Sequence, residues 1–173
     1  WGFRKSAPEK VRGIFSNLQI LSAAFLAYSH GKNDGQMPIG LIAMALMAYY
    51  GYSEFYIPFW AIAASAASIS FGTLIGGRRV IETLGLKVTT LRPVNGFAVN
   101  ISAATVIEVA SHFGIPVSTT HCISTAIMGV GATRRLSAVR WGIARNIVLT
   151  WILTFPACGI LGWLIASLLK IVF

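Results

Sequence analysis

The sequence predicts an all-α, polytopic membrane protein that combines a broken transmembrane helix with a re-entrant helical hairpin. Two observations carry this prediction. First, 55% of the 173 residues are hydrophobic and only 11% are charged, whereas about 25% of the residues in soluble domains are charged. Second, two short polar stretches, residues 30–36 and 118–121, interrupt apolar runs. Polar groups at membrane depth usually face a cavity on an ion or substrate path.

Basic residues are concentrated in short segments between the apolar runs. In a soluble domain the net charge of +9 would raise the question of nucleic acid. Bases clustered between apolar runs instead follow the positive-inside rule, so we expect no nucleic-acid partner. We therefore predict a basic cytoplasmic lead-in over residues 1–13 and a transmembrane domain over residues 14–173, in a multi-pass protein of the cell membrane. Because the chain begins at Trp1 and within a basic segment, we expect it to be a piece of a longer protein.

Residues 14–50 form the first apolar run. About 37 residues would make a helix roughly 55 Å long, against a membrane core of about 30 Å. Gly31 and Gly35 lie in its polar stretch, and glycine permits the backbone to leave helical geometry. Unwound backbone at membrane depth is tolerated where it lines a cavity. We therefore expect two helical pieces that meet at a break over residues 30–36, with the second piece starting near Gln36.

Two further runs have the length of single transmembrane helices. Residues 58–77 are about 20 apolar and small residues with Pro58 in the first turn, and residues 147–169 are about 23 residues long. Between the first of these runs and the next, residues 78–84 are predicted to form a short interfacial helix.

The run at 122–133 decides the predicted topology. At about 12 residues it is too short to cross, because a span needs about 20. Residues 93–133 are therefore predicted to form a re-entrant hairpin, with its tip at 116–121 inside the membrane. Pro116 supports a turn there, because a proline disfavours helical geometry in the preceding residue.

This hairpin leaves three crossings, at 14–50, 58–77 and 147–169. The basic segments 1–13, 78–92 and 134–145 then fall on one face, and the base-free loop 51–57 falls on the other. The positive-inside rule makes the basic face cytoplasmic.

The two polar stretches supply different chemistry. Ser118, Thr119 and Thr120 precede a helix, where Ser and Thr are favoured as N-caps. A helix start presents unpaired N–H groups and partial positive charge, and added hydroxyls suit it to a tetrahedral oxyanion such as phosphate. Asn33 and Asp34 bring oxygen ligands for a hard cation. The alternative is that these polar residues only hold helices together.

Three residues are candidates for coupling or gating. His121 can titrate near neutral pH and so take part in proton coupling. Lys32 either reaches the site or extends away from it to the interface. Glu108 lies on the first arm of the hairpin, where it gates, pairs with Lys32 or Arg92, or faces water. A direct ligand role is the less favoured alternative for both His30 and His121.

Both polar stretches resemble motifs of one family, the PiT inorganic phosphate transporters. Residues 30–34, His-Gly-Lys-Asn-Asp, are similar to its H-G-x-N-D motif, and residues 114–121 are similar to its G-x-P-V-S-T-T-H motif. The resemblance implies the C-terminal half, or second repeat, of an inverted-repeat transporter that moves phosphate with Na⁺ or H⁺. Lys32 departs from the pattern, which has a small residue there. Asn100 lies where relatives often carry an acid, so it receives no ionic role.

The resemblance also assigns residues and partners. It implies that Asn33, Ser118, Thr119 and Thr120 bind phosphate, and that Asn33 and Asp34 bind the cation, with Asp34 as a metal ligand if the cation is Na⁺. The expected partners are phosphate, Na⁺ or H⁺, the lipid bilayer and the missing N-terminal repeat; a homodimer remains open. We expect no cofactor.

The sequence thus predicts a cation-coupled phosphate symporter that works by alternating access and is not an enzyme. Two alternatives remain. One is an intramembrane hydrolase that uses Ser118, His121 and Asp34, and the other is a passive anion channel.

Overall fold

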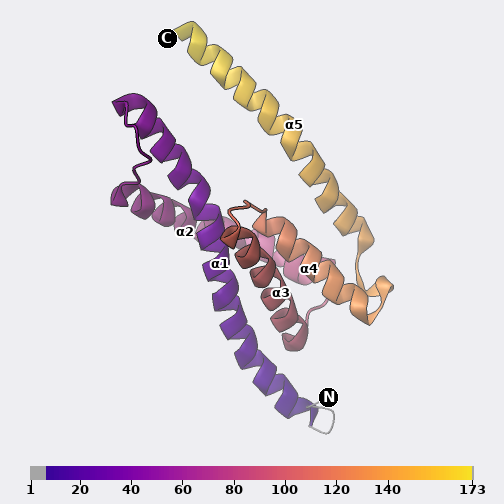
Figure 1. The fold of residues 1–173 in the computed structure, drawn as a ribbon. Helices are drawn as coiled ribbons and strands as arrows, with labels where there is room; N and C mark the ends of the chain where they lie inside the picture. The colour runs from indigo at the N-terminus through magenta and orange to yellow at the C-terminus, as the bar shows by residue number, and fades with distance from the viewer. Residues whose placement is uncertain (1–6, 173) are drawn as a thin grey trace.

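The computed structural model describes residues 7–172, except the side chains of Arg79, Lys87 and Val172. The first six residues of the predicted lead-in and Phe173 lie outside the described residues. The described chain contains only helices and connecting loops, which confirms the all-α prediction. In chain order the helices are α1 (Pro8–Tyr50), α2 (Phe59–Glu82), the π-helix η1 (Thr83–Val88), α3 (Pro93–His112), α4 (Thr119–Arg134), the 3₁₀ turn η2 (Leu136–Ala138) and α5 (Trp141–Val172) (Figure 1).

The predicted break in the first helix is wrong, because α1 is one helix of 43 residues that remains helical through 30–36. It also begins at Pro8, inside the predicted lead-in, and no second helix starts at Gln36. Gly35 is buried, and a Cβ placed on it would lie 4.0 Å from Ile69 Cδ1 of α2. This glycine therefore lies at a helix crossing, and at 4.0 Å a Cβ there would make an ordinary van der Waals contact with α2.

Helix α3 lies along the N-terminal half of α1 and runs in the same direction. Phe97 packs edge-on against Phe15 at a centroid distance of 5.6 Å, and Asn100 Nδ2 donates to Ser22 Oγ at 3.2 Å. The approach is close because Gly96 faces Gln19, whose Nε2 would lie only 2.3 Å from a Cβ at that position. Small side chains at such an interface let the two backbones pack tightly.

Helices α3 and α4 form the predicted helical hairpin, and its tip lies beside the middle of α1 (Figure 1). The tip begins earlier than predicted, since α3 ends at His112 and Gly114 has a left-handed φ of 69°. It also ends earlier, because α4 starts at Thr119. Asn33, which contacts the tip, lies about 38 Å along α1 from Pro8 and about 26 Å from Tyr50. The position of the tip supports a hairpin that turns back within the membrane.

The predicted interfacial helix at 78–84 is wrong. Helix α2 continues without interruption to Glu82, and the chain then forms η1. The hydrophobic core explains this continuity, because Leu84 and Val88 of η1 are buried against Val99 of α3, Ile127 of α4 and Val139. Burial of an apolar side chain is worth about 1.5–3 kcal/mol, so η1 is held against the hairpin by its buried side chains and does not form a separate surface helix.

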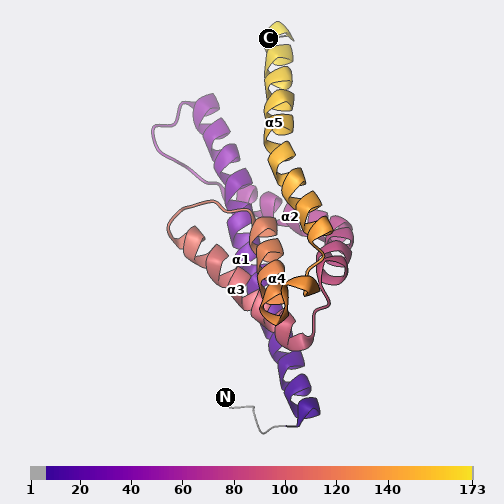
Figure 2. The ribbon, with the colours of Figure 1, turned by 90° about the vertical axis from the view of Figure 1, so that its right-hand side faces the viewer.

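Three of the described helices are long and apolar enough to cross a membrane: Phe59–Arg78, Pro93–His112 and Trp141–Ile171. Two of these agree with predicted crossings, and the third is the first arm of the hairpin. α1 is absent from this group, since the polar stretch in its middle lowers its hydropathy. α5 begins six residues earlier than predicted and projects away from the other helices in both views (Figures 1 and 2).

Candidate functional site

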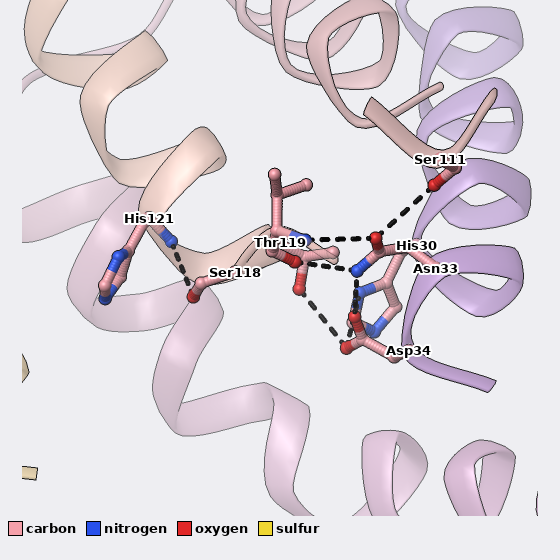
Figure 3. Close-up of polar contacts among 8 residues, drawn as sticks. His30, Asn33, Asp34, Ser111, Ser118, Thr119 and His121 are labelled. Carbon is pink, nitrogen blue, oxygen red and sulfur yellow. Dashed lines mark hydrogen bonds and ion pairs between the residues drawn. The ribbon is translucent and has the colours of Figure 1, made fainter. Parts of the chain in front are cut away.

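Asn33, in the first polar stretch, bonds to the hairpin just before the second polar stretch begins. Its side chain is 5% exposed. Nδ2 donates to the carbonyl oxygen of Val117 at 2.7 Å and to Asp34 Oδ1 at 2.9 Å. Oδ1 accepts from the Ser111 hydroxyl and from the Val117 N–H, each at 3.4 Å (Figure 3). An amide has two donor hydrogens and two acceptor lone pairs. All four are used, so Asn33 fixes the hairpin tip to α1.

Asp34 presents the negative charge of the site. Its side chain is 35% exposed. Oδ1 accepts from Asn33, and Oδ2 accepts from Thr119 Oγ1 at 3.3 Å. His30 Nδ1 lies 3.3 Å from Oδ2 one helical turn away, close enough for an ion pair when the imidazole is protonated, although the two are not aligned as a hydrogen bond. The carboxylate therefore lies between a hydroxyl, an amide and an imidazole.

The backbone of Asp34 adds a further oxygen. Pro38 lies inside α1 and has no N–H with which to donate to the carbonyl four residues earlier, which is that of Asp34. That carbonyl therefore lacks its usual helical donor even though α1 does not unwind. Carboxylate and carbonyl oxygens are the ligands that hard cations prefer.

The predicted hydroxyl run separates into three environments at the start of α4. Ser118 is the N-cap and accepts a hydrogen bond from the His121 N–H at 3.4 Å, as predicted for this position. Thr119 is 4% exposed and donates to Asp34. Thr120 instead lines a separate cavity of about 360 Å³ between α2, η1, α4 and α5. The imidazole of His121 lies against Trp151 at a ring-centroid distance of 3.9 Å, on the side away from Asp34 (Figure 3).

Lys32 and Glu108 form an ion pair between α1 and α3, which is one of the alternatives left open for Glu108. Lys32 Nζ donates to Glu108 Oε1 at 2.5 Å, and both side chains are about one-third exposed. Glu108 Oε2 and Ser29 Oγ are buried with no hydrogen-bond partner among the described residues. Lys32 precedes Asn33 in the chain, so an ion pair with no net charge lies next to the cation-ligand candidates.

Among residues 7–172, no group of three or more His, Cys, Asp or Glu side chains is arranged to hold a metal ion. The arrangement around Asp34 resembles a site for a monovalent cation or a proton more than a transition-metal site, because its ligands are oxygens.

Some contributors to the site are absent from the sequence-based prediction. Ser111 and the backbone of Val117 bind Asn33, Pro38 alters the Asp34 carbonyl, and Trp151 stacks with His121. The signal for Pro38 was available, since it stands four residues after Asp34. No local pattern links Ser111 or Trp151 to the site, because their contacts depend on how the hairpin and α5 pack.

The chain matches the Phosphate transporter family over residues 3–162. It belongs to this family. This membership confirms the resemblance drawn from the two motifs. The family consists of integral membrane transporters with several spanning helices and not of enzymes.

Several relatives of this Phosphate transporter family member are named as phosphate transporters. A probable low-affinity inorganic phosphate transporter of Rhizobium meliloti is 46% identical, covering 94% of this chain and 49% of its own length. One of the same name from Bacillus subtilis is 40% identical, covering 99% and 52%. The chain thus spans about half the length of these curated relatives. A solved structure described as the sodium-dependent phosphate transporter matches with a TM-score of 0.77 and 38% identity, over 88% of this chain and 39% of that one.

The geometry also argues against the hydrolase alternative. A Ser–His–Asp triad needs the imidazole between the hydroxyl and the carboxylate. Here the His121 ring lies against Trp151, and Ser118 accepts a bond from the backbone of His121, not from its ring.

Proposed function

We propose that the chain is the C-terminal half of an inorganic phosphate transporter that couples phosphate uptake to Na⁺ or H⁺ by alternating access. The observation that carries the proposal is the attachment of the hairpin tip to the middle of α1, through Asn33 and through Thr119 on Asp34. This contact brings an anion-binding helix start beside a carboxylate. Broken or re-entrant helices that present such ends at mid-membrane are a recurring transporter device.

Phosphate binds, in this proposal, at the N-terminus of α4. Ser118 is exposed there and α4 presents its first N–H groups, which together with the helix dipole favour an anion. Thr119 lies between the phosphate site and Asp34: its hydroxyl donates its one proton to the carboxylate, and its backbone N–H at the start of α4 is available to phosphate. Asn33 positions the tip. Its predicted contacts with phosphate and cation stay predictions, as does that of Thr120, which would have to turn out of its cavity.

The cation binds at Asp34. Its carboxylate, its own carbonyl and the Thr119 hydroxyl supply oxygens within one small region. The solved relative is described as sodium-dependent, which favours Na⁺ as the coupling ion. A phosphate anion and a carboxylate repel each other, and a cation between them offsets that repulsion. Binding of one therefore promotes binding of the other, which is the basis of symport.

Lys32 and Glu108 act as a gate in this proposal. Their ion pair links α1 to α3 next to the site, so any movement of the hairpin arm relative to α1 has to break it or carry it along. His121, packed on Trp151, connects the first turn of α4 to α5 in the same way.

The partner that completes the site is a preceding repeat of inverted orientation. The relatives are about twice as long as this chain, and none of the apolar stretch of α5 is buried. Such a surface packs against lipid or against the other half of the transporter.

Uptake by the full-length transporter in proteoliposomes tests this proposal. Asp34→Asn removes the charge and keeps the shape, so it should abolish cation-stimulated phosphate uptake without reducing membrane insertion. Glu54→Gln is the matched control, because Glu54 is an exposed acid in the loop between α1 and α2, and it should leave uptake unchanged. Normal cation dependence in Asp34→Asn would refute the assignment. Flux that ignores cation gradients in the unmodified protein would instead identify a channel.

A further inference from the structure

Two connecting segments pack tightly together at the end of the hairpin that lies away from the tip: residues 89–92, between η1 and α3, and residues 135–140, between α4 and α5. The Arg140 N–H donates to the carbonyl of Val88 at 3.0 Å. Gly131 of α4 faces both connectors so closely that a Cβ there would lie 2.9 Å from Val139 Cγ2 and 3.3 Å from Thr89 Oγ1. Thr89 is 5% exposed. The backbone at this corner is therefore fixed by packing.

An open polar pocket of about 570 Å³ lies at this corner and is here called the basic pocket. Its lining combines hydroxyl and guanidinium side chains, from Thr89, Thr90, Arg134, Arg135, Ser137 and Arg140, together with Ala138. The chain has only five acidic residues, and none of them lines the pocket. The carbonyl end of α4 contributes about half a negative charge. The guanidinium groups in the lining carry more positive charge than this, so the net charge around the pocket is positive.

We propose that the basic pocket binds a phosphate group at the membrane surface, at a site separate from the one at the hairpin tip. Helix α4 has 16 residues, so the two sites lie about 24 Å apart along it. Arginine forks match phosphate oxygens in a bidentate geometry, and threonine and serine hydroxyls donate to the remaining oxygens. Basic pockets between membrane helices on the cytoplasmic side bind anionic lipid headgroups.

The phosphate group has two sources, an anionic lipid headgroup or free inorganic phosphate. A solvated basic loop that merely obeys the positive-inside rule gives a different expectation. In that case any arginine at this end is equivalent, and the pocket has no preference for phosphate over other anions.

The test uses purified full-length transporter in nanodiscs of phosphatidylcholine with added phosphatidylglycerol, and mass spectrometry of the retained lipid. Arg134→Gln with Arg135→Gln should weaken phosphatidylglycerol retention roughly fivefold per arginine, from about 1 kcal/mol per basic residue near the surface. Arg145→Gln is the matched control, since Arg145 is an exposed arginine in the first turns of α5 and does not line the pocket. Ser137→Asp adds a repelling charge at an exposed position without removing any packing, so it separates binding from misfolding.

The two sources give different results. If the ligand is a lipid headgroup, the pocket variants lose phosphatidylglycerol and inorganic phosphate does not displace it. If the ligand is free phosphate, lipid retention is unchanged and the number of phosphate ions bound per protein falls in the pocket variants. Should Ser137→Asp and the double arginine variant match Arg145→Gln in both measurements, the proposed site is refuted. Transport through the hairpin tip would remain unaffected by that outcome.

Discussion

Asn33→Ala should detach the hairpin tip from α1. The substitution removes a short bond to the Val117 carbonyl and one to the Asp34 carboxylate. A neutral hydrogen bond contributes about 0.5–1.5 kcal/mol and one to a charged group about 1.5–3 kcal/mol. The two acceptor contacts at 3.4 Å are long and add little. The bond to Asp34 lies within α1 and does not hold the tip, so only the Val117 bond counts toward attachment. The expected loss is therefore about 0.5–1.5 kcal/mol, or a fall of roughly 2- to 13-fold in the ratio of attached to detached tip.

Two measurements on the purified full-length protein report this change. Amide hydrogen exchange should accelerate over residues 113–118, because exchange follows local opening. Phosphate affinity should fall, since the helix start at Ser118 is no longer held beside Asp34. Both effects follow from one lost attachment, so they should appear together.

Asn100→Ala is the matched control. Asn100 also bridges α3 to α1, through Ser22 Oγ at 3.2 Å and the Gln19 carbonyl at 3.4 Å, but it lies near the start of α3 and far from the tip. Its loss should lower thermal stability without changing exchange at the tip or phosphate affinity. If Asn33→Ala behaves like Asn100→Ala, Asn33 only holds helices together and the reasoning fails.

Three further predictions address other parts of the molecule. Thr119→Val keeps the shape and deletes the donor to Asp34, so phosphate affinity should fall about 10-fold or more; lower thermal stability at normal affinity would show a packing role. Lys32→Met leaves the Glu108 carboxylate without its cation and should slow uptake, whereas Lys32→Met with Glu108→Gln should restore expression and part of the rate. If uptake by the double variant is no faster than uptake by Lys32→Met alone, the loss of the ion pair is not the cause of the slower uptake. A cysteine at Glu54 should react with an impermeant reagent added outside whole cells and one at Ser137 should not; labelling of both would refute the shared basic face.

The all-α fold and the meeting of the two polar stretches were predictable because hydrocarbon leaves little choice. Buried polar groups in such surroundings need partners, and a chain with few polar residues offers few pairings. The same reasoning left Lys32 as one of two partners for Glu108, and the structure selects it. Ser118 as N-cap followed from residue type and the position of a helix start.

The predicted break in α1 failed because glycine permits unwinding without requiring it. Whether the backbone leaves the helix depends on what crosses at Gly35, and that is a matter of tertiary packing. Here α2 crosses there, with Ile69 nearest, and the helix is maintained. The environments of Thr120 and His121 were unpredictable for a similar reason, since they depend on where α5 lies.

An unbroken α1 still provides what a broken helix would contribute to ion binding. A break frees carbonyl oxygens for a cation and a helix N-terminus for an anion. In this protein Pro38 removes the donor that the Asp34 carbonyl would otherwise have, and the helix N-terminus comes from α4, brought to the same place by the hairpin. In the proposed site, the two functions of a broken helix are thus divided between a proline in one helix and the cap of another, and the Asn33 amide holds the hairpin tip against α1 next to both.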